Sequence, residues 1–268
     1  AISPWSIQLS RGAFEANLFV FFIPLAAYAY LSGKHFSSLV LFALGFYSYH
    51  TARYFIPLVV LALIIYRRPP LSVRNIGLAV LFVVLLLPGL YSLIGPGSSR
   101  ASDVGIFNPT DNWESVASKR FESRYKGMPD IVARVFSNKL SFVASQFTKA
   151  YFTYLSPYFL FVQGAGETTY GMLSGRGVLH YPDALLLIGF FALLVTRPRK
   201  QHWLIFALLL FAPLPAALAK GQGIAANRAI SMLPFLIIAA ASGLVYLKTK
   251  LAHLRFLSPA LLVVIYLV

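Results

Sequence analysis

Long apolar runs alternate with short basic connections along most of this chain, and one long polar stretch interrupts them. A helix needs about 20 apolar residues to cross the hydrocarbon core of a bilayer, and fewer where it is buried among neighbouring helices. By this criterion the pattern predicts eight membrane-spanning helices. They are expected at residues 13–32, 36–49, 54–66, 76–94, 184–196, 203–219, 229–247 and 256–268.

The polar stretch, residues 95–183, divides the chain into three parts. Residues 1–94 hold the first four predicted spans, and residues 184–268 hold the last four, the final one truncated. Within the polar stretch, the pair Asp111 and Glu114 resembles a capping box and predicts a helix start. Apolar residues that recur every three or four positions after Pro129 predict a second helix that reaches Tyr154. Such helices lie along a membrane surface or pack on the ends of spans.

The composition agrees with an all-α polytopic membrane protein. Hydrophobic residues make up 58% of the chain and charged residues 12%, against about 45–50% and about 25% in ordinary globular domains. The net charge of +15 would suggest nucleic acid in a soluble protein, but these basic residues cluster between apolar runs, where they act as topology signals. No nucleic-acid partner is therefore expected. The chain has no cysteine, which excludes disulfides and thiolate chemistry.

The charges also predict which face of the membrane each connection occupies. Seven of the eight carboxylates lie in residues 95–183. Residues 36–66 form either one long helix or two short helices that turn at His50 to Arg53. A turn places ten Lys and Arg residues and no carboxylate on one face, which is cytoplasmic by the positive-inside rule. One long helix would put Lys34 on the other face, so we predict the hairpin, with residues 95–183 extracytoplasmic.

Five candidate binding residues lie at the predicted outer ends of the spans. Arg11 and Glu15 are four apart, so a continuous helix would hold them on one face, either as an ion pair or as a cavity wall. His50 and Arg53 lie in the predicted turn, where ionisable groups need water or a partner such as an anion; a snorkelling Arg and a hydrogen-bonded His are the alternative. Arg228 begins the seventh predicted span, and helix starts favour phosphate, although basic residues there are also common without a ligand.

The glycine-rich segment 163–177 is predicted to be a loop. Glu167 and Tyr170 supply an acid and an aromatic surface, and Arg176 and His180 supply two phosphate partners; a flexible connector is the alternative. The loop has no phosphate-binding or dinucleotide spacing. The five histidines of the chain never form a close ligand pair, so local sequence predicts no metal site. A divalent metal held by distant residues stays an open alternative.

Several segments together resemble a known family. They are Ser3-Pro4-Trp5 with Leu9-Ser10-Arg11, Glu15-Ala16-Asn17, Tyr47-Ser48-Tyr49-His50-Thr51-Ala52-Arg53, Pro213-Leu214-Pro215-Ala216-Ala217, and Asn227-Arg228-Ala229 followed by Leu233-Pro234. In this combination the chain resembles bacterial glycosyltransferases related to family 39, the dolichyl-phosphate-mannose protein mannosyltransferase-like members of the GT-C superfamily.

The resemblance implies a prokaryotic inner-membrane enzyme. It would transfer a sugar from a polyprenyl-phosphate-linked donor to a protein, lipid or glycan acceptor on the extracytoplasmic face. His50, Arg53 and Arg228 would then bind the phosphate, while Arg11 and Glu15 would shape the cavity. The principal catalytic acid of the family lies in the first outer loop, which we expect upstream of Ala1, so no catalytic residue is assigned.

The chain departs from the family pattern in one loop, and two alternative functions stay open. Glu167 and Tyr170 stand where the family often has Asp or Asn and His, which puts the part of this loop in substrate binding in doubt. One alternative is a non-enzymatic transporter or scaffold for anionic lipid-linked envelope precursors, although no inverted repeat is visible. The other is an oligosaccharide polymerase or ligase, which shares multiple spans and a large outer loop.

Overall fold

The computed structural model describes residues 3–12, 15–94, 105–107, 109–166, 175–219 and 224–250. The described residues form helices and no strand, as expected for an all-α protein; only two isolated bridge pairs add β-type pairing. The first helices are α1 (Pro4–Arg11), α2 (Ala16–Leu31), α3 (His35–Ser48), α4 (Ala52–Arg67) and α5 (Val73–Ile94). The polar stretch contains α7 (Pro109–Tyr125), α8 (Asp130–Phe136), α9 (Lys139–Leu155) and the π-helix η2 (Tyr158–Gln163). The last part contains α10 (Tyr181–Thr196), α11 (Lys200–Phe211), α12 (Leu214–Ala217), the 3-10 helix η4 (Ile230–Met232) and α13 (Leu233–Lys250).

Three helical segments of the described chain are long and apolar enough to cross a membrane: Val73–Ser92, Lys200–Ala217 and Ile230–Lys250. Shorter apolar helices coincide with other predicted spans, namely Ala16–Leu31, His35–Ser48 and Tyr181–Thr196. Each of these has 14 to 16 residues, which at 1.5 Å per residue gives about 21–24 Å, less than the bilayer core of roughly 30 Å. The described residues are therefore all-helical, and three of their helices are long enough to span a membrane. The eighth predicted span, at residues 256–268, lies outside the described residues.

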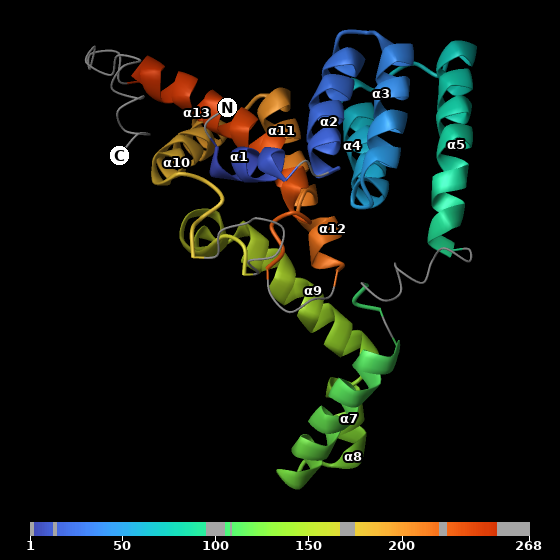
Figure 1. The fold of residues 1–268 in the computed structure, drawn as a ribbon, viewed down its shortest axis with the longest axis vertical. Coiled ribbons are helices and arrows are strands. Elements are labelled where there is room, and N and C mark those ends of the chain that lie inside the picture. The colour runs from blue at the N-terminus through green and yellow to red at the C-terminus, as the bar shows by residue number, and fades with distance from the viewer. Residues whose placement is uncertain are drawn as a thin grey trace.

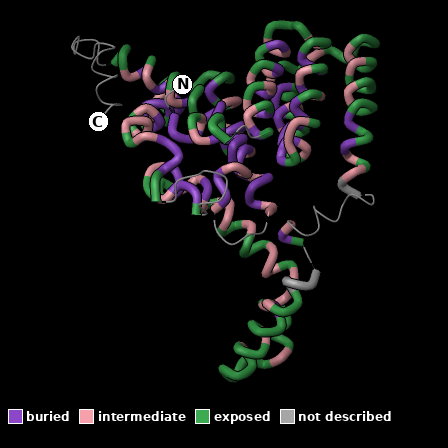
Figure 2. The backbone as a smooth tube through the Cα atoms, viewed as in Figure 1, coloured by how far each residue is buried: buried purple, intermediate pink, exposed green. Residues whose placement is uncertain are grey.

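Helices α2, α3 and α4 pack side by side, and α5 stands at their edge (Figure 1). A glycine in α3 allows α2, α3 and α4 to approach one another closely. A Cβ at Gly45 would lie 3.2 Å from Ile56 of α4 and 3.3 Å from Phe22 of α2. Most of α5 is exposed, in contrast to the purple core of the bundle (Figure 2). An apolar helix with this exposure suits contact with lipid.

The predicted hairpin between the second and third spans is confirmed. Helix α3 ends at Ser48 because Tyr49 is extended, with φ −150° and ψ 142°, and α4 begins at Ala52. A single helix through residues 36–66 is therefore wrong. At the far ends of the helices, the Arg67 guanidinium donates a hydrogen bond to the Leu31 carbonyl, which joins the end of α4 to the end of α2.

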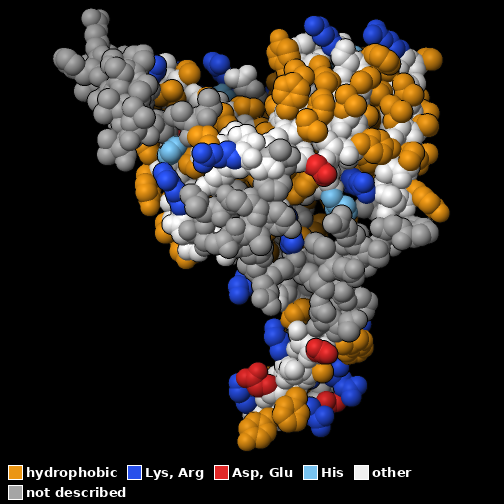
Figure 3. Space-filling model, in the orientation of Figure 1, with side chains coloured by type: hydrophobic (Ala, Val, Ile, Leu, Met, Phe, Trp, Pro, Cys, Tyr) orange, Lys and Arg blue, Asp and Glu red, His pale blue; other side chains and the backbone are white. Residues whose placement is uncertain are grey.

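The basic connections gather at one end of the bundle. Helix α11 packs along α4, and α12, which follows it, meets the beginning of α4. Lys200, at the other end of α11, therefore lies toward Arg67. Thr196 Oγ1 donates to Tyr246 Oη at 3.0 Å, which places the end of α10 beside the end of α13. Figure 3 shows Lys and Arg side chains along the upper edge of the bundle, with the visible carboxylates below it.

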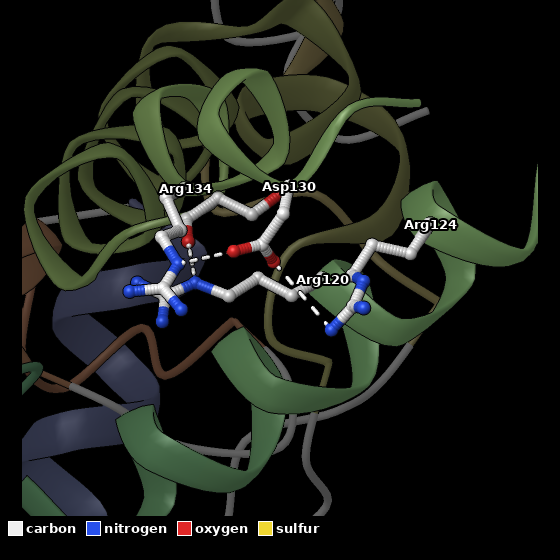
Figure 4. A network of polar contacts seen from close by, with 5 residues as sticks. Arg120, Arg124, Asp130 and Arg134 are labelled. Atoms are coloured by element: carbon white, nitrogen blue, oxygen red, sulfur yellow. Dashed lines mark hydrogen bonds and ion pairs between the residues drawn. The ribbon is translucent and has the colours of Figure 1, made fainter. Parts of the chain in front are cut away.

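Helices α7 and α8 form a hairpin that projects away from the bundle, and α9 connects it to the rest of the chain (Figure 1). Asp130, the first residue of α8, connects the two helices through its carboxylate, which lies 3.5 Å from Arg124 of α7; within α8 the same carboxylate lies 2.8 Å from Arg134 (Figure 4). Arg120 Nε donates to the Ser137 carbonyl at 2.6 Å. These side chains are exposed, so each ion pair contributes little, about 0–1 kcal/mol.

The helices of this hairpin differ in two ways from the prediction. Helix α7 begins at Pro109, so the helix starts before Asp111, the predicted first residue of the capping box. The predicted second helix breaks at residues 137–138, because the Asn138 side chain accepts a hydrogen bond from Ser141 N at 2.8 Å while Ser141 Oγ accepts one from Asn138 N at 3.0 Å. This capping box opens α9 as a separate helix and lets the chain change direction.

Two titratable side chains in this region have shifted pKa values. The hydrogen bond and charge of Lys126 hold the pKa of Glu122 below its ordinary value. A lowered carboxyl pKa favours the folded state above the unfolded pKa, and this contribution disappears as the pH falls through the folded pKa. Burial raises the pKa of Tyr151, whose hydroxyl donates to the Leu210 carbonyl at 2.9 Å and so fastens α9 to α11.

Candidate functional site

A cavity of about 310 Å³ lies where the start of α2, the turn between α3 and α4, and the segment around α12 and η4 meet. This volume is at the lower end of the range for small-molecule sites, roughly 300–1,000 Å³. The cavity is lined by Glu15, Tyr49, His50, Thr51, Tyr54, Gly105, Pro215, Leu218, Ala219 and Arg228. It brings together three predicted site residues that are far apart in the sequence: Glu15, His50 and Arg228.

The turn between α3 and α4 positions the aromatic and imidazole walls of the cavity. The extended backbone of Tyr49 ends α3, and its hydroxyl donates to the Asn227 carbonyl at 3.2 Å. The rings of His50 and Tyr54 pack at 5.8 Å between centroids. The hydrogen bond from Tyr49 joins this turn directly to the residue before Arg228, so the side chains of His50 and Arg228 are held on adjoining segments.

Arg228 lies in a turn and not at the start of a long helix, which corrects the prediction for the seventh span. Its N–H donates to the Ala225 carbonyl at 3.1 Å. The 3-10 helix η4 follows, and α13 begins only at Leu233. The backbone of a long helix therefore does not present its free N–H groups at Arg228, and binding of an anion there must depend on the guanidinium. Ser231 Oγ donates to the Ala212 carbonyl at 2.6 Å and anchors this turn in the core.

Arg11 and Glu15 do not share a helix, so their predicted pairing is wrong. Helix α1 ends at Arg11 with Gly12 as its cap, and Glu15 is the residue that precedes α2. The chain instead joins the two helices through Asn17, whose side-chain amide donates to the Leu9 carbonyl at 2.8 Å. Within the described residues, no ion pair connects Arg11 with Glu15. Only Glu15 lines the cavity; Arg11 is exposed outside it.

Arg53 lies next to the cavity but points away from it. Its Nη1 donates to Ser92 Oγ at 2.7 Å, and Ser92 Oγ in turn donates to the Gly89 carbonyl at 2.7 Å. Arg53 therefore joins the start of α4 to the end of α5. Among the described atoms, its Nε is buried without a hydrogen-bond partner. The structure shows a contact of Arg53 with Ser92, and a contact of Arg53 with phosphate stays a prediction.

Gly105, Leu218 and Ala219 also line the cavity, although the sequence pattern marks none of them as a site residue. Gly105 reaches the cavity through an antiparallel bridge with Ala219, beside a hydrogen bond from Ile106 N to the Leu218 carbonyl at 3.1 Å. Gly105 and Ala219 are more than 100 positions apart in the sequence, and no local sequence pattern predicts a contact between them.

Of the predicted loop candidates, Arg176 and His180 are not among the residues that line the described cavity. Glu167 and Tyr170 lie outside the described residues. His180 caps α10, and its N–H donates to Asp183 Oδ2 at 3.0 Å. Gly164 and Arg176 form a bridge, and a Cβ at Gly177 would collide with the backbone of Phe161, so the described ends of this loop need glycine for close approach.

The described lining combines one carboxylate, one guanidinium, one imidazole and two phenols. A guanidinium presents a planar fork of N–H donors that matches phosphate, and an imidazole can donate a second hydrogen bond or carry a proton. Glu15 can accept hydrogen bonds from hydroxyl groups. In the described part of the chain, His, Asp and Glu side chains form no group of three or more that could hold a metal ion. The chemistry of this set fits a phosphate-bearing, hydroxyl-rich ligand.

No protein-family model, curated protein or solved structure matches this chain.

Proposed function

We propose that this protein is a membrane glycosyltransferase that moves a sugar from a polyprenyl-phosphate-linked donor to an acceptor on the extracytoplasmic face. One observation carries the proposal. The segments that resemble the family 39-related enzymes are dispersed through the sequence, yet four of them supply residues to one cavity: Glu15, the turn residues Tyr49 to Thr51, Pro215 and Arg228. Convergence of this kind is expected of a substrate site and is not required by packing alone.

The orientation of the bundle supports the same proposal. Glu15 precedes α2 and Thr51 precedes α4, whereas Lys34, Arg67 and Arg68 follow the other ends of these two helices. The cavity therefore lies at the end opposite the basic connections. With those connections in the cytoplasm of a prokaryotic cell, an eight-span topology would place the cavity and residues 95–183 outside the inner membrane.

The chemistry that we propose requires stabilisation of a leaving phosphate. The acceptor hydroxyl oxygen attacks the anomeric carbon, and the bond from this carbon to the phosphate oxygen breaks with its electron pair leaving on the phosphate. The acceptor proton passes to a general base. The phosphate charge changes from about −1 to about −2 in this step, so a fixed cation binds the transition state more tightly than the donor.

The cavity residues take separate roles in this step. Arg228 stabilises the charge that develops on the phosphate, and His50 donates a hydrogen bond to it. Glu15 accepts hydrogen bonds from sugar hydroxyls and shapes the cavity. Arg53 holds the α3–α4 turn in place through Ser92 and acts as a positioning residue.

The proposed activity can be measured with the full-length protein in proteoliposomes supplied with a radiolabelled polyprenyl-phosphate sugar and an extract of envelope acceptors. We expect label to move to the acceptor and polyprenyl phosphate to be released in equal amount. Label that crosses the bilayer on an intact donor would identify a transporter and overturn the proposal. A donor that is neither cleaved nor moved across the bilayer would favour a scaffold. Transfer of whole oligosaccharides only would favour a polymerase or ligase.

A further inference from the structure

A second cavity, of about 300 Å³, opens between α3, α4 and α5 at the basic end of the bundle. Its walls are apolar and include Leu39 and Phe42 of α3, Leu63 of α4 and Phe82 of α5. The polar side chains in the lining are those of Tyr30, His35, Ser38 and Asn75, and the hydroxyl of the buried Ser38 donates to the Ala26 carbonyl. An apolar groove with polar groups at one end has the form of a site for an amphiphile.

The groove exists because α5 touches its neighbours mainly at the other end. There, a Cβ at Gly89 would lie only 2.5 Å from the Phe46 ring, and Tyr47 Oη donates to the Leu85 carbonyl at 2.6 Å. Toward its beginning α5 departs from α3, and the Phe42 and Phe82 rings meet at 6.5 Å between centroids. The cavity lies beyond this pair, toward the start of α5.

One buried polar atom in the lining lacks a partner. The Tyr30 hydroxyl is shielded from solvent and has no hydrogen bond within the described residues. The His35 ring packs edge-on against the Tyr30 ring at 5.2 Å, which holds the phenol in this position. Buried hydroxyl groups are nearly always hydrogen-bonded. Because Tyr30 also lines the cavity, its unsatisfied hydroxyl points to a ligand with a hydrogen-bond acceptor.

The positive charge at this end of the cavity favours an anionic ligand. Lys34 and Arg68 lie in the connections at this end, Arg67 ends α4 and Arg74 lies in the first turn of α5. No carboxylate occurs in the sequence between Glu15 and Asp103. The Asn75 side chain donates to the Pro70 carbonyl at 2.9 Å, which keeps the start of α5 beside these arginines. Clusters of Lys and Arg at the cytoplasmic edge of a membrane attract anionic lipid headgroups.

We propose that this groove binds an anionic phospholipid of the surrounding leaflet. One acyl chain lies between α3 and α5 in contact with Phe42 and Phe82, and the phosphate accepts a hydrogen bond from Tyr30 beside Arg67. The bound lipid fills the space under the start of α5 and fixes this helix to the bundle. The site is independent of the proposed sugar transfer and lies at the opposite end of the helices.

Retention of lipids by the full-length protein tests this site. The protein would be reconstituted in nanodiscs with equal amounts of phosphatidylglycerol and phosphatidylcholine of the same chains, then released and analysed by native mass spectrometry. We expect phosphatidylglycerol to be retained preferentially. Tyr30→Phe removes a hydroxyl that has no protein partner, so we expect this variant to fold normally and to weaken retention about fivefold, the worth of one hydrogen bond.

A pair of variants on adjacent residues separates the groove from general lipid contact. Ala79→Trp fills the cavity, while Val80→Trp places the same ring on the neighbouring position, which is exposed and outside the lining. We expect Ala79→Trp to abolish preferential retention and Val80→Trp to leave it unchanged. Equal retention of both lipids by the unmodified protein, or unchanged retention in Tyr30→Phe and Ala79→Trp, would overturn the site whatever the sugar-transfer assay shows.

Discussion

Replacement of Arg228 by Gln is expected to lower kcat/KM for sugar transfer by about 10²–10³-fold, the usual cost of removing one group that stabilises charge in a transition state. Arg228 is the only guanidinium among the residues that line the described cavity. Gln keeps some hydrogen-bonding capacity but carries no charge, so the loss should fall mainly on kcat, because the phosphate gains negative charge as the bond to the sugar breaks. The measurement is steady-state transfer from a polyprenyl-phosphate sugar.

Two further variants show whether the effect belongs to charge at this position. Arg228→Lys retains the charge but loses the planar fork of donors, so we expect an intermediate rate. Arg199→Gln removes an arginine from the opposite, basic end of the bundle and should leave the rate unchanged. If Arg228→Gln and Arg199→Gln have equal rates and equal unfolding temperatures, Arg228 does not act on the phosphate.

Among Gly-to-Ala replacements in the described helices, Gly243→Ala is expected to lower the stability of the protein the most. Helices α10 and α13 cross at this glycine, and an added Cβ would overlap the Leu186 carbonyl and lie 2.7 Å from Phe190 N. Both neighbours are backbone atoms and cannot rotate away, so the helices must separate. Overpacking of this kind costs about 1–3 kcal/mol and occasionally more. The measurement is the unfolding temperature in detergent.

The matched control is Gly77→Ala in α5. No atom lies within 4 Å of a Cβ at Gly77, so the added methyl meets no neighbour and also favours the helix, by roughly 0.5–1 kcal/mol. We expect the unfolding temperature of Gly77→Ala to equal or exceed that of the unmodified protein. Similar unfolding temperatures for Gly243→Ala and Gly77→Ala would show that α10 and α13 do not pack as described.

The apolar runs predicted the existence and order of the helices well, because a run of apolar residues must either cross a membrane or lie in a core. Local breaks were harder to predict. The interruption between Arg11 and Glu15, and the turn before α13, depend on where individual backbone groups find hydrogen bonds, as for Arg228 N with Ala225. A helical period can continue through such a break, so the pattern alone does not reveal it.

The candidate site could be predicted only in part for a related reason. His50, Glu15 and Arg228 were singled out because ionisable groups near the ends of apolar runs need a partner. Their assembly in one cavity depends on contacts between distant segments, such as Tyr49 with Asn227. Arg53 was expected to join the same site, but its guanidinium donates a hydrogen bond to Ser92. Nothing in the sequence marks Ser92 as a partner of Arg53.

Photocrosslinking measures most directly whether the cavity holds the phosphate of a lipid-linked sugar. A polyprenyl-phosphate sugar that carries a diazirine on the carbon next to the phosphate would be irradiated with the full-length protein in proteoliposomes, and the adducts mapped by mass spectrometry. We predict adducts on the α3–α4 turn around His50 and on the turn around Arg228, which unlabelled donor suppresses by competition. Adducts confined to the basic end of the bundle, or adducts that unlabelled donor does not suppress, would contradict a phosphate site in this cavity.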